Sequence, residues 1–159
     1  MTVKNLWWIV AILALVLLAL SGQKYLRQRA LSVAITRATL QQSCHLEQAA
    51  CTARFDDGQT VTLNLSPRPI PLLKTLQLSV QLSSGQDIQR VDIDFVGTNM
   101  DMGFNRSKLS RKSTDFFQGT GVLSICTQRR MEWEAQVFLH TKAGMKLAIF
   151  PFYTINKAN

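Results

Sequence analysis

The chain has 159 residues, a formal net charge of +8, three cysteines and two histidines. This length suggests one domain with appendages. We expect no enzyme, because the sequence contains no Gly-x-Ser-x-Gly element, phosphate-binding P-loop or dinucleotide fingerprint. We also expect no nucleic-acid partner, because no aromatic residues are interleaved with the basic run at 106–112 for stacking on bases.

The first predicted element is an uncharged apolar run at 6–20. A helix that crosses a membrane needs roughly 17–25 predominantly apolar residues. Trp7 and Trp8 suit the level of the lipid headgroups. A cleaved secretory signal is the alternative, with cleavage near 19–21, but the run is longer than an ordinary signal core. We therefore predict an uncleaved transmembrane anchor at 1–22.

The segment 23–42 mixes basic residues with apolar residues at helical spacing, and it predicts a partly helical stalk. Lys24, Arg27 and Arg29 follow the predicted span, and Lys4 precedes it. Removing these four from the 18 basic residues, against 10 acidic ones, leaves a net charge of +4 for the rest of the chain. Basic residues beside a bilayer suit anionic lipid headgroups.

Two patterns conflict about the side of the membrane on which the main domain lies. The basic residues after the span would keep the domain in the cytoplasm under the positive-inside rule. However, long domains translocate with less regard to flanking charge, and paired cysteines are expected outside the cytosol. We predict a single-pass inner-membrane protein with a periplasmic C-terminal domain.

The cysteines suggest an oxidised pair and a third thiol. Cys44 and Cys51 flank six residues, a spacing that closes a small loop or bridges two hairpin strands. Because the number is odd, Cys126 is a free thiol, a ligand, or half of a different pair.

From Cys51 onward, apolar and polar residues alternate with a period of two, which predicts β-strands. The predicted core positions are Val61, Leu63, Leu65, Leu76, Leu78, Val80, Leu82, Val91, Ile93, Phe95, Phe117, Leu123, Ile125, Met131, Trp133, Ala135, Val137 and Leu139. About seven strands with one apolar face predict an antiparallel immunoglobulin-like β-sandwich. We assign this all-β domain to 43–155 and a tail to 156–159, and Pro151 suits an edge position for the last strand.

Polar segments within this domain receive simple structural interpretations. The run at 106–112 predicts a solvated basic loop, and the three prolines at 66–71 predict an extended connector. Asp92 and Asp94 share one strand face, and we expect that face to be exposed to solvent rather than to hold an acid pair for catalysis.

Soft ligands form the most distinctive set of candidate site residues. Met100 and Met102 lie in a loop beyond a predicted strand, and in an extended chain their sulfur atoms would lie about 7 Å apart. With Cys126 and Met131 they offer thioether and thiolate groups, which select Cu(I). The alternative is that methionine fills gaps in a core. Because the loop lies outside the core alternation, both interpretations remain open.

Gly103, Asn105 and Arg106 follow the two methionines. Gly103 allows the chain to curl, and hydrogen bonds from Asn105 and Arg106 would hold the loop. Arg106 is otherwise an anion-binding residue or a plain surface arginine. Methionine also suits adaptable contact surfaces, so these residues define a candidate contact loop for a partner protein.

Several motifs together resemble a group of small membrane-anchored proteobacterial proteins. They are the Cys-x6-Cys pair, "SPRPIPLLK", Met-x-Met-Gly-x-Asn-Arg, Gly-x-Gly-x-Leu-x-x-Cys and Arg-Met-x-Trp. This group is associated with Sco-type copper chaperones and cytochrome oxidase assembly. The layout is also similar to FixH-like and YtkA-like proteins, which have one anchor and an immunoglobulin-like periplasmic domain.

The resemblance implies copper-handling roles for Met100, Met102, Cys126 and Met131, and a disulfide between Cys44 and Cys51. It also implies that copper is the cofactor and that a respiratory complex subunit or a copper chaperone is the partner. Unlike dedicated copper carriers, the chain has no His-rich or Met-rich tract, which argues against tight copper binding.

Three functional hypotheses follow in order of preference. The first is a membrane-anchored periplasmic accessory protein for copper handling or respiratory complex assembly. The second is an interaction module that binds a membrane partner, without metal, through the Met-x-Met-Gly-x-Asn-Arg loop. The third is a thiol redox protein, which ranks last because no Cys-x-x-Cys motif is present.

Overall fold

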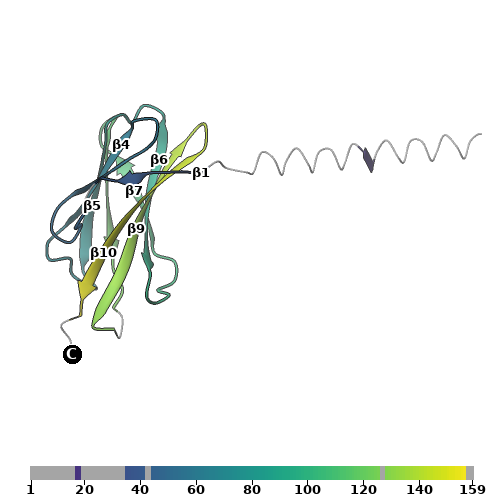
Figure 1. The fold of residues 1–159 in the computed structure, drawn as a ribbon. Helices are drawn as coiled ribbons and strands as arrows, with labels where there is room; N and C mark the ends of the chain where they lie inside the picture. Colours follow the sequence, from purple (N-terminus) through teal and green to yellow (C-terminus); the bar gives the residue numbers. More distant parts are fainter. Residues whose placement is uncertain (1–16, 19–34, 42–43, 126–127, 157–159) are drawn as a thin grey trace, which may run out of the picture. The chain divides into compact units, whose positions relative to one another are not determined.

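The computed structural model describes residues 17–18, 35–41, 44–125 and 128–156. Most of the predicted anchor at 1–22 lies outside these residues, as does Cys126. Among the residues described, no helix is both long enough and apolar enough to cross a membrane. A compact unit begins at Ile35 and contains all the described strands (Figure 1).

From Ile35 onward the described chain is built of β-strands, which confirms the predicted all-β class. The strands are β1 (Ile35–Arg37), β2 (Thr39–Leu40), β3 (Cys51–Arg54), β4 (Thr60–Ser66), β5 (Thr75–Leu82), β6 (Ile88–Gly97), β7 (Arg106–Arg111), β8 (Phe116–Val122), β9 (Arg130–Thr141) and β10 (Met145–Ile155). β1 and β2 lie within the segment predicted as a partly helical stalk, and most of the rest of that segment lies outside the described residues.

The ten strands form one mixed sheet in the order β1-β10-β9-β6-β7-β8-β5-β4-β3-β2. All neighbouring pairs are antiparallel except β1 and β10, which run parallel. Because β10 also contacts β2 and β3, the sheet is nearly closed around its core. The predicted count of about seven strands is therefore too low, and the predicted purely antiparallel pairing is wrong for one pair.

The additional strands are β1, β2 and β7. β1 and β2 have three and two residues, which is too short for an alternating pattern to be recognised. β7 is the run predicted as a basic loop, and that prediction is wrong. Its inward residue Leu109 is 3% exposed and lies opposite Val91 of β6. The other residues of β7 are mostly polar because most of them face away from the core.

The predicted alternation places the apolar side chains inside, as expected for a half-buried sheet. The predicted core residues of β4, β5, β6 and β9 are all buried. Ile125 is the exception, with 47% of its surface exposed: β8 ends at Val122, and the alternation continues only to Leu123, which is buried.

An aromatic cluster ties β6, β9 and β10 together at the core. The Phe95 and Phe152 rings meet edge to face at 6.1 Å, and Trp133 stacks on Phe152 at 6.3 Å. The indole Nε1 of Trp133 donates a hydrogen bond of 3.0 Å to Oγ1 of Thr154. Both buried polar atoms are thereby satisfied, so this cluster buries large apolar surface without an unpaired polar group.

Two covalent or charged contacts reinforce the side on which the sheet nearly closes. A disulfide joins Cys44 to Cys51, whose Cα atoms are 5.5 Å apart. Lys146 of β10 forms an ion pair with Asp57 in the turn between β3 and β4. The Lys146 ammonium also donates to Oε1 of Gln59 at 2.9 Å and lies over the Phe55 ring at 5.1 Å. The turn and the strand β10 are therefore held together across the gap in the sheet.

The Lys146 ammonium, together with the Gln59 backbone N–H, lowers the pKa of Asp57. A lowered folded-state pKa contributes stability above the ordinary pKa near 3.8, and this contribution is lost as the pH falls through the folded value. We expect Asp57→Asn to reduce the unfolding free energy at pH 7 by less than about 1 kcal/mol, since the carboxylate is largely exposed. The difference from the parent chain should vanish at a pH below the lowered pKa. Urea unfolding at several pH values measures this, and an equal difference at all pH values would contradict it.

Candidate functional site

The Met-x-Met loop and the connection between β8 and β9 lie side by side at one end of the sheet. Thr98 N–H donates to Glu132 O at 3.0 Å. The Asn99 side chain bonds to both its neighbours on β9, donating to Arg130 O at 3.2 Å and accepting from Glu132 N–H at 3.2 Å. The start of the loop is therefore fixed to the start of β9.

The second half of the loop is a turn held by its own side chains. The carboxylate of Asp101 accepts a 2.8 Å hydrogen bond from Gly103 N–H. Gly103 has a φ of 70°, which a glycine adopts without the steric cost of a Cβ. Asn105 then donates from Nδ2 to Val122 O at 2.9 Å, and its carbonyl accepts from Phe95 N–H at 3.0 Å. Asn105 thus links the loop to the end of β8.

Arg106 pairs with a carboxylate that is almost completely buried. Its guanidinium donates to Oδ2 of Asp94 from Nη2 at 3.0 Å and from Nε at 3.2 Å. It also lies over the Phe138 ring at 4.4 Å and the Phe104 ring at 5.1 Å. Asp94 is only 7% exposed, and its Oδ1 has no hydrogen-bond partner among the described atoms. Arg106 is therefore the group that makes burial of this carboxylate tolerable.

Asp92, two residues earlier on the same face, has a similar environment. It is 4% exposed, and its Oδ2 lies 2.9 Å from Nε of Arg90 and 2.9 Å from Nε2 of His140. The prediction that Asp92 and Asp94 are solvated is wrong. Long basic side chains from β6 and β7, with His140 from β9, cover the two carboxylates.

Two of the predicted soft ligands converge on one glycine. The position that a Cβ would occupy on Gly97 lies 2.3 Å from Cε of Met131 and 2.9 Å from Cγ of Met102. Met131 is 2% exposed, Met102 is half-buried against the core, and Met100 is 36% exposed on the loop. Gly97 is thus needed so that both side chains can approach the backbone.

The predicted ligand set is only partly assembled by the described residues. The structure brings Met102 and Met131 together and places Met100 in the adjoining loop, whereas Cys126 lies outside the described residues. In the part of the chain that the structure describes, no group of three or more His, Cys, Asp or Glu side chains is arranged to hold a metal ion.

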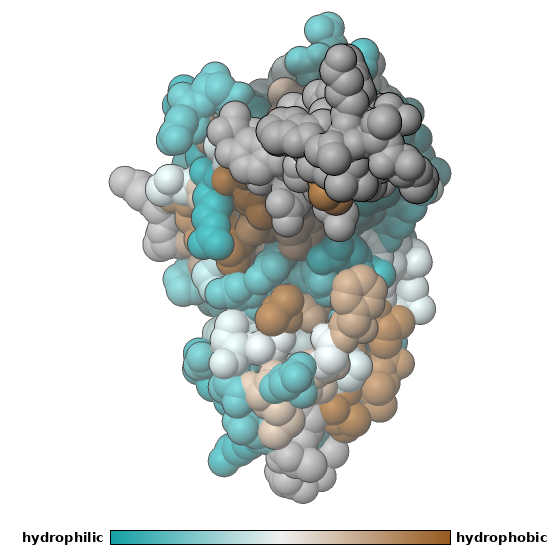
Figure 2. All heavy atoms as spheres, turned by 90° about the vertical axis from the view of Figure 1, so that its right-hand side faces the viewer, coloured by the Kyte–Doolittle hydropathy of each residue, from teal (hydrophilic) through white to brown (hydrophobic). Residues whose placement is uncertain are grey.

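Two exposed apolar side chains lie on the Met-x-Met loop, and two more lie at the end of β8 and just beyond it. Phe104 is 80% exposed, Ile125 47%, Val122 43% and Met100 36%. We call these four residues the apolar rim. Figure 2 shows hydrophobic side chains gathered on the lower part of one face, toward the end at which β10 finishes in Figure 1. Exposed apolar side chains that cluster in this way are typical of a contact surface.

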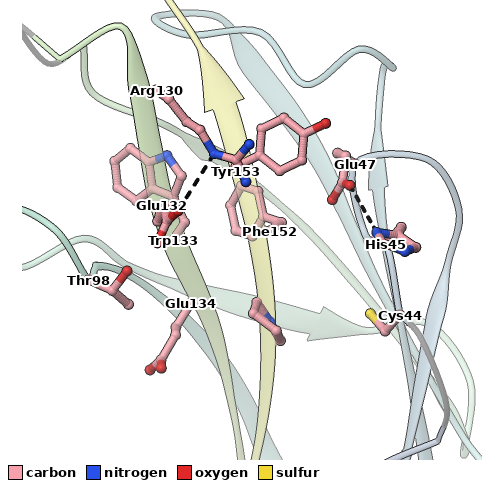
Figure 3. A pocket seen from close by; sticks show the side chains of 11 residues that line it. Cys44, His45, Glu47, Thr98, Arg130, Glu132, Trp133, Glu134, Phe152 and Tyr153 are labelled. Atoms are coloured by element: carbon pink, nitrogen blue, oxygen red, sulfur yellow. Dashed lines mark ion pairs between the residues drawn. The ribbon is translucent and has the colours of Figure 1, made fainter.

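A hollow of about 400 Å³ lies beside the last part of β10. In Figure 3, Glu132 and Trp133 lie on one side of it, His45 and Glu47 on the other, and Tyr153 between them. The Arg130 guanidinium stacks on the Tyr153 ring at 4.0 Å and lies 3.6 Å from Glu132. No sequence pattern indicates this hollow, because residues far apart in the chain form it.

Comparisons of the chain with models of protein families, with curated protein sequences and with solved structures find no match. The site is therefore interpreted from its own chemistry and geometry.

The pair between Arg106 and Asp94 gives a direct test of what positions the loop. We expect Arg106→Ala to lower the unfolding free energy by about 2 kcal/mol, because it leaves a buried carboxylate unpaired. The loss should be smaller than in a fully buried pair, since 34% of the Arg106 side chain is exposed. Arg106→Lys should lose less, because it keeps the charge but not the two-point contact. Denaturant unfolding measures both variants, together with Asp94→Asn/Arg106→Ala, which should recover part of the loss.

Proposed function

We propose that this chain is a membrane-anchored periplasmic accessory protein that docks on a partner protein through the apolar rim. The observation that carries the proposal is that Met100 and Phe104 are exposed on a loop fixed by hydrogen bonds. The exposed Val122 follows at the end of β8, to which Asn105 of the loop is bonded. A preorganised loop loses little conformational entropy on binding, so its exposed apolar surface favours association.

The position of the rim within the domain supports a protein partner. The described chain enters at β1, which pairs with Met145 at the start of β10. The rim lies at the other end of the sheet, where Ile155 of β10 pairs with Arg130. β10 has 11 residues, so the two ends are about 35 Å apart at roughly 3.3 Å per residue. The rim is thus well separated from the point at which the chain enters the domain.

We further propose that the domain is a variant of the immunoglobulin-like sandwich. The neighbours β10, β9 and β6 would correspond to strands G, F and C, and β4, β5 and β8 to strands A, B and E. β1, β2 and β3 would then be additions before the shared strands. Such sandwiches commonly present contact loops at their ends, and the rim occupies that position.

The location and the partner class rest on the sequence. The disulfide between Cys44 and Cys51 suits an oxidising compartment. The apolar run at 6–20 suits an inner-membrane anchor. The resemblance to proteins associated with cytochrome oxidase assembly favours a respiratory complex subunit or its copper chaperone as the partner.

Site-specific crosslinking in intact membranes tests the docking surface. A photo-reactive amino acid at position 104 of the full chain should form a discrete adduct with a membrane protein, and the adduct should persist in copper-free cells. The same amino acid at position 142, in the turn at the opposite end, is the matched control. Ile125→Ser should reduce the adduct several-fold without changing stability by more than about 0.5 kcal/mol, since the side chain is half exposed. Equal adducts from both positions would contradict the proposal.

A second candidate function, Cu(I) handling at the same end, is favoured by the approach of Met102 and Met131 to Gly97. Two thioethers provide soft ligands, and Met100 and Cys126 would complete a transient site. Because Met131 is almost fully buried, the metal would bind at the border between core and loop.

Competition with a Cu(I) chelator tests this second function. Met102→Leu/Met131→Leu keeps the apolar volume and removes both sulfur atoms, so it should weaken Cu(I) binding at least about tenfold with a small change in stability. Cys126→Ser should also weaken binding. Met145→Leu, at the start of β10, is the control and should bind as the parent chain does. Unchanged affinity in the double variant would remove the ligand assignment.

A further inference from the structure

The last part of β10 has one edge that is not paired with another strand. Asn156 N–H, just after β10, donates to Arg129 O. In this antiparallel register the even-numbered residues of β10 therefore direct their N–H and C=O groups toward β9. Leu147 O accepts from Ala38 N–H on the other side, so the odd-numbered residues face away from β9. Pro151 fits this assignment, because it has no N–H and can occupy only a position outside the ladder with β9.

The chain itself pairs with the first part of this edge. β1 pairs with β10 from Met145 to Leu147 and then ends, and β2 pairs with β3 instead. Beyond Leu147, no described strand pairs with this edge of β10. The outward N–H groups of Tyr153 and Ile155 have no partner among the described hydrogen bonds. An open edge with free donors and acceptors is a template for another extended chain.

Two hollows lie beside this open edge and share lining residues. The hollow of Figure 3 is lined by Pro151 and Tyr153 of β10. A second groove, of about 810 Å³, is lined by Tyr153 and Ile155 of β10 and by the loop at 69–74. Tyr153 and Glu47 line both hollows, which are therefore adjacent. Their size suits a short peptide.

The side chains along the edge differ between its two faces. Tyr153 lies opposite Glu132 on the outer face of β9 and β10, and the hollow there is also lined by Glu47 and Glu134. Two basic residues also line this hollow: Arg130 contacts Glu132 and Tyr153, and Nδ1 of His45 lies 3.4 Å from Glu47. Three carboxylates thus lie beside one arginine and one histidine. This face therefore has an excess of negative charge.

The inner face of the same edge is apolar. Phe152 and Thr154 are 5% and 4% exposed and point toward the core. The groove beside them is lined by apolar residues of the loop at 69–74, among them Ile70 and Leu72. An added strand places alternate side chains on opposite faces. The edge therefore matches a peptide that alternates basic and apolar residues.

We propose that the open edge of β10 binds an extended peptide segment of a partner protein by strand addition. The partner segment alternates basic with apolar residues. Its backbone bonds to Tyr153 and Ile155, its basic side chains lie beside Glu47 and Glu132, and its apolar side chains enter the groove. Strand addition takes affinity from the main chain and specificity from alternate side chains. Ile125 of the apolar rim also lines this groove, so the two surfaces adjoin. The strand addition does not rest on the docking proposed for the rim, because it uses the backbone of β10.

The probe is a short acetylated and amidated peptide of alternating lysine and valine, titrated against the full chain in detergent. Two further peptides carry N-methyl groups on all lysines or on all valines. Only one of these two sets of N–H groups can face β10 in an added strand. We expect saturable binding of the parent peptide and at least about tenfold weaker binding of exactly one methylated peptide. Equal binding of all three, or no binding of the parent peptide, would overturn the proposal.

Ile155→Pro removes one outward N–H without touching the ladder with β9, as Pro151 already does in the same strand. We expect it to weaken binding of the parent peptide about tenfold, whereas Ile155→Val keeps the N–H and should bind normally. Phe104→Ser, on the apolar rim, should leave peptide binding unchanged. A loss of peptide binding in this variant would overturn the assignment of the binding site to the edge of β10. A different result would be that the parent chain does not bind the peptide but associates with itself, and that Ile155→Pro abolishes this association. That result would assign the edge to a second copy of the chain and overturn the peptide proposal.

Discussion

The pairing of β6 with β9, and of β9 with β10, is the constraint on which the rest of the domain depends. Their inward side chains, including Phe95, Trp133 and Phe152, form the aromatic part of the core. Burial of this apolar surface fixes the three strands relative to one another. Because Gly97 and Met131 belong to paired strands, the two methionine side chains meet at the end of the core rather than in solvent.

The charged face of the same strands has a different physical basis. Asp92 and Asp94 lie on the outside of β6 and would ordinarily be solvated. β7 pairs with β6 at these two residues, and basic side chains from β6 and β7 cover the two carboxylates. Arg106 joins this face to the contact loop, because it pairs with Asp94 and stacks on both Phe138 and Phe104. The geometry of the rim thus depends partly on a buried ion pair.

The domain presents two surfaces with complementary properties. The apolar rim is exposed, preorganised and largely uncharged, which suits association by burial of apolar area. The open edge of β10 offers main-chain hydrogen bonds beside a negatively charged hollow. Both occur where strand pairing ends. The rim lies at the loop between β6 and β7 and at the end of β8, and the open edge begins where β1 ends.

The sequence by itself determined the all-β class, most strands and most of the core, because period-two alternation reports directly which side chains face inward. It suggested the cysteine pair from spacing and placed the methionines in a loop. Only the tertiary structure decided that the basic run at 106–112 contributes strand β7, that two aspartates are buried, and that β10 has an open edge. Each of these depends on which distant strand lies alongside, and a local pattern carries no information about that neighbour.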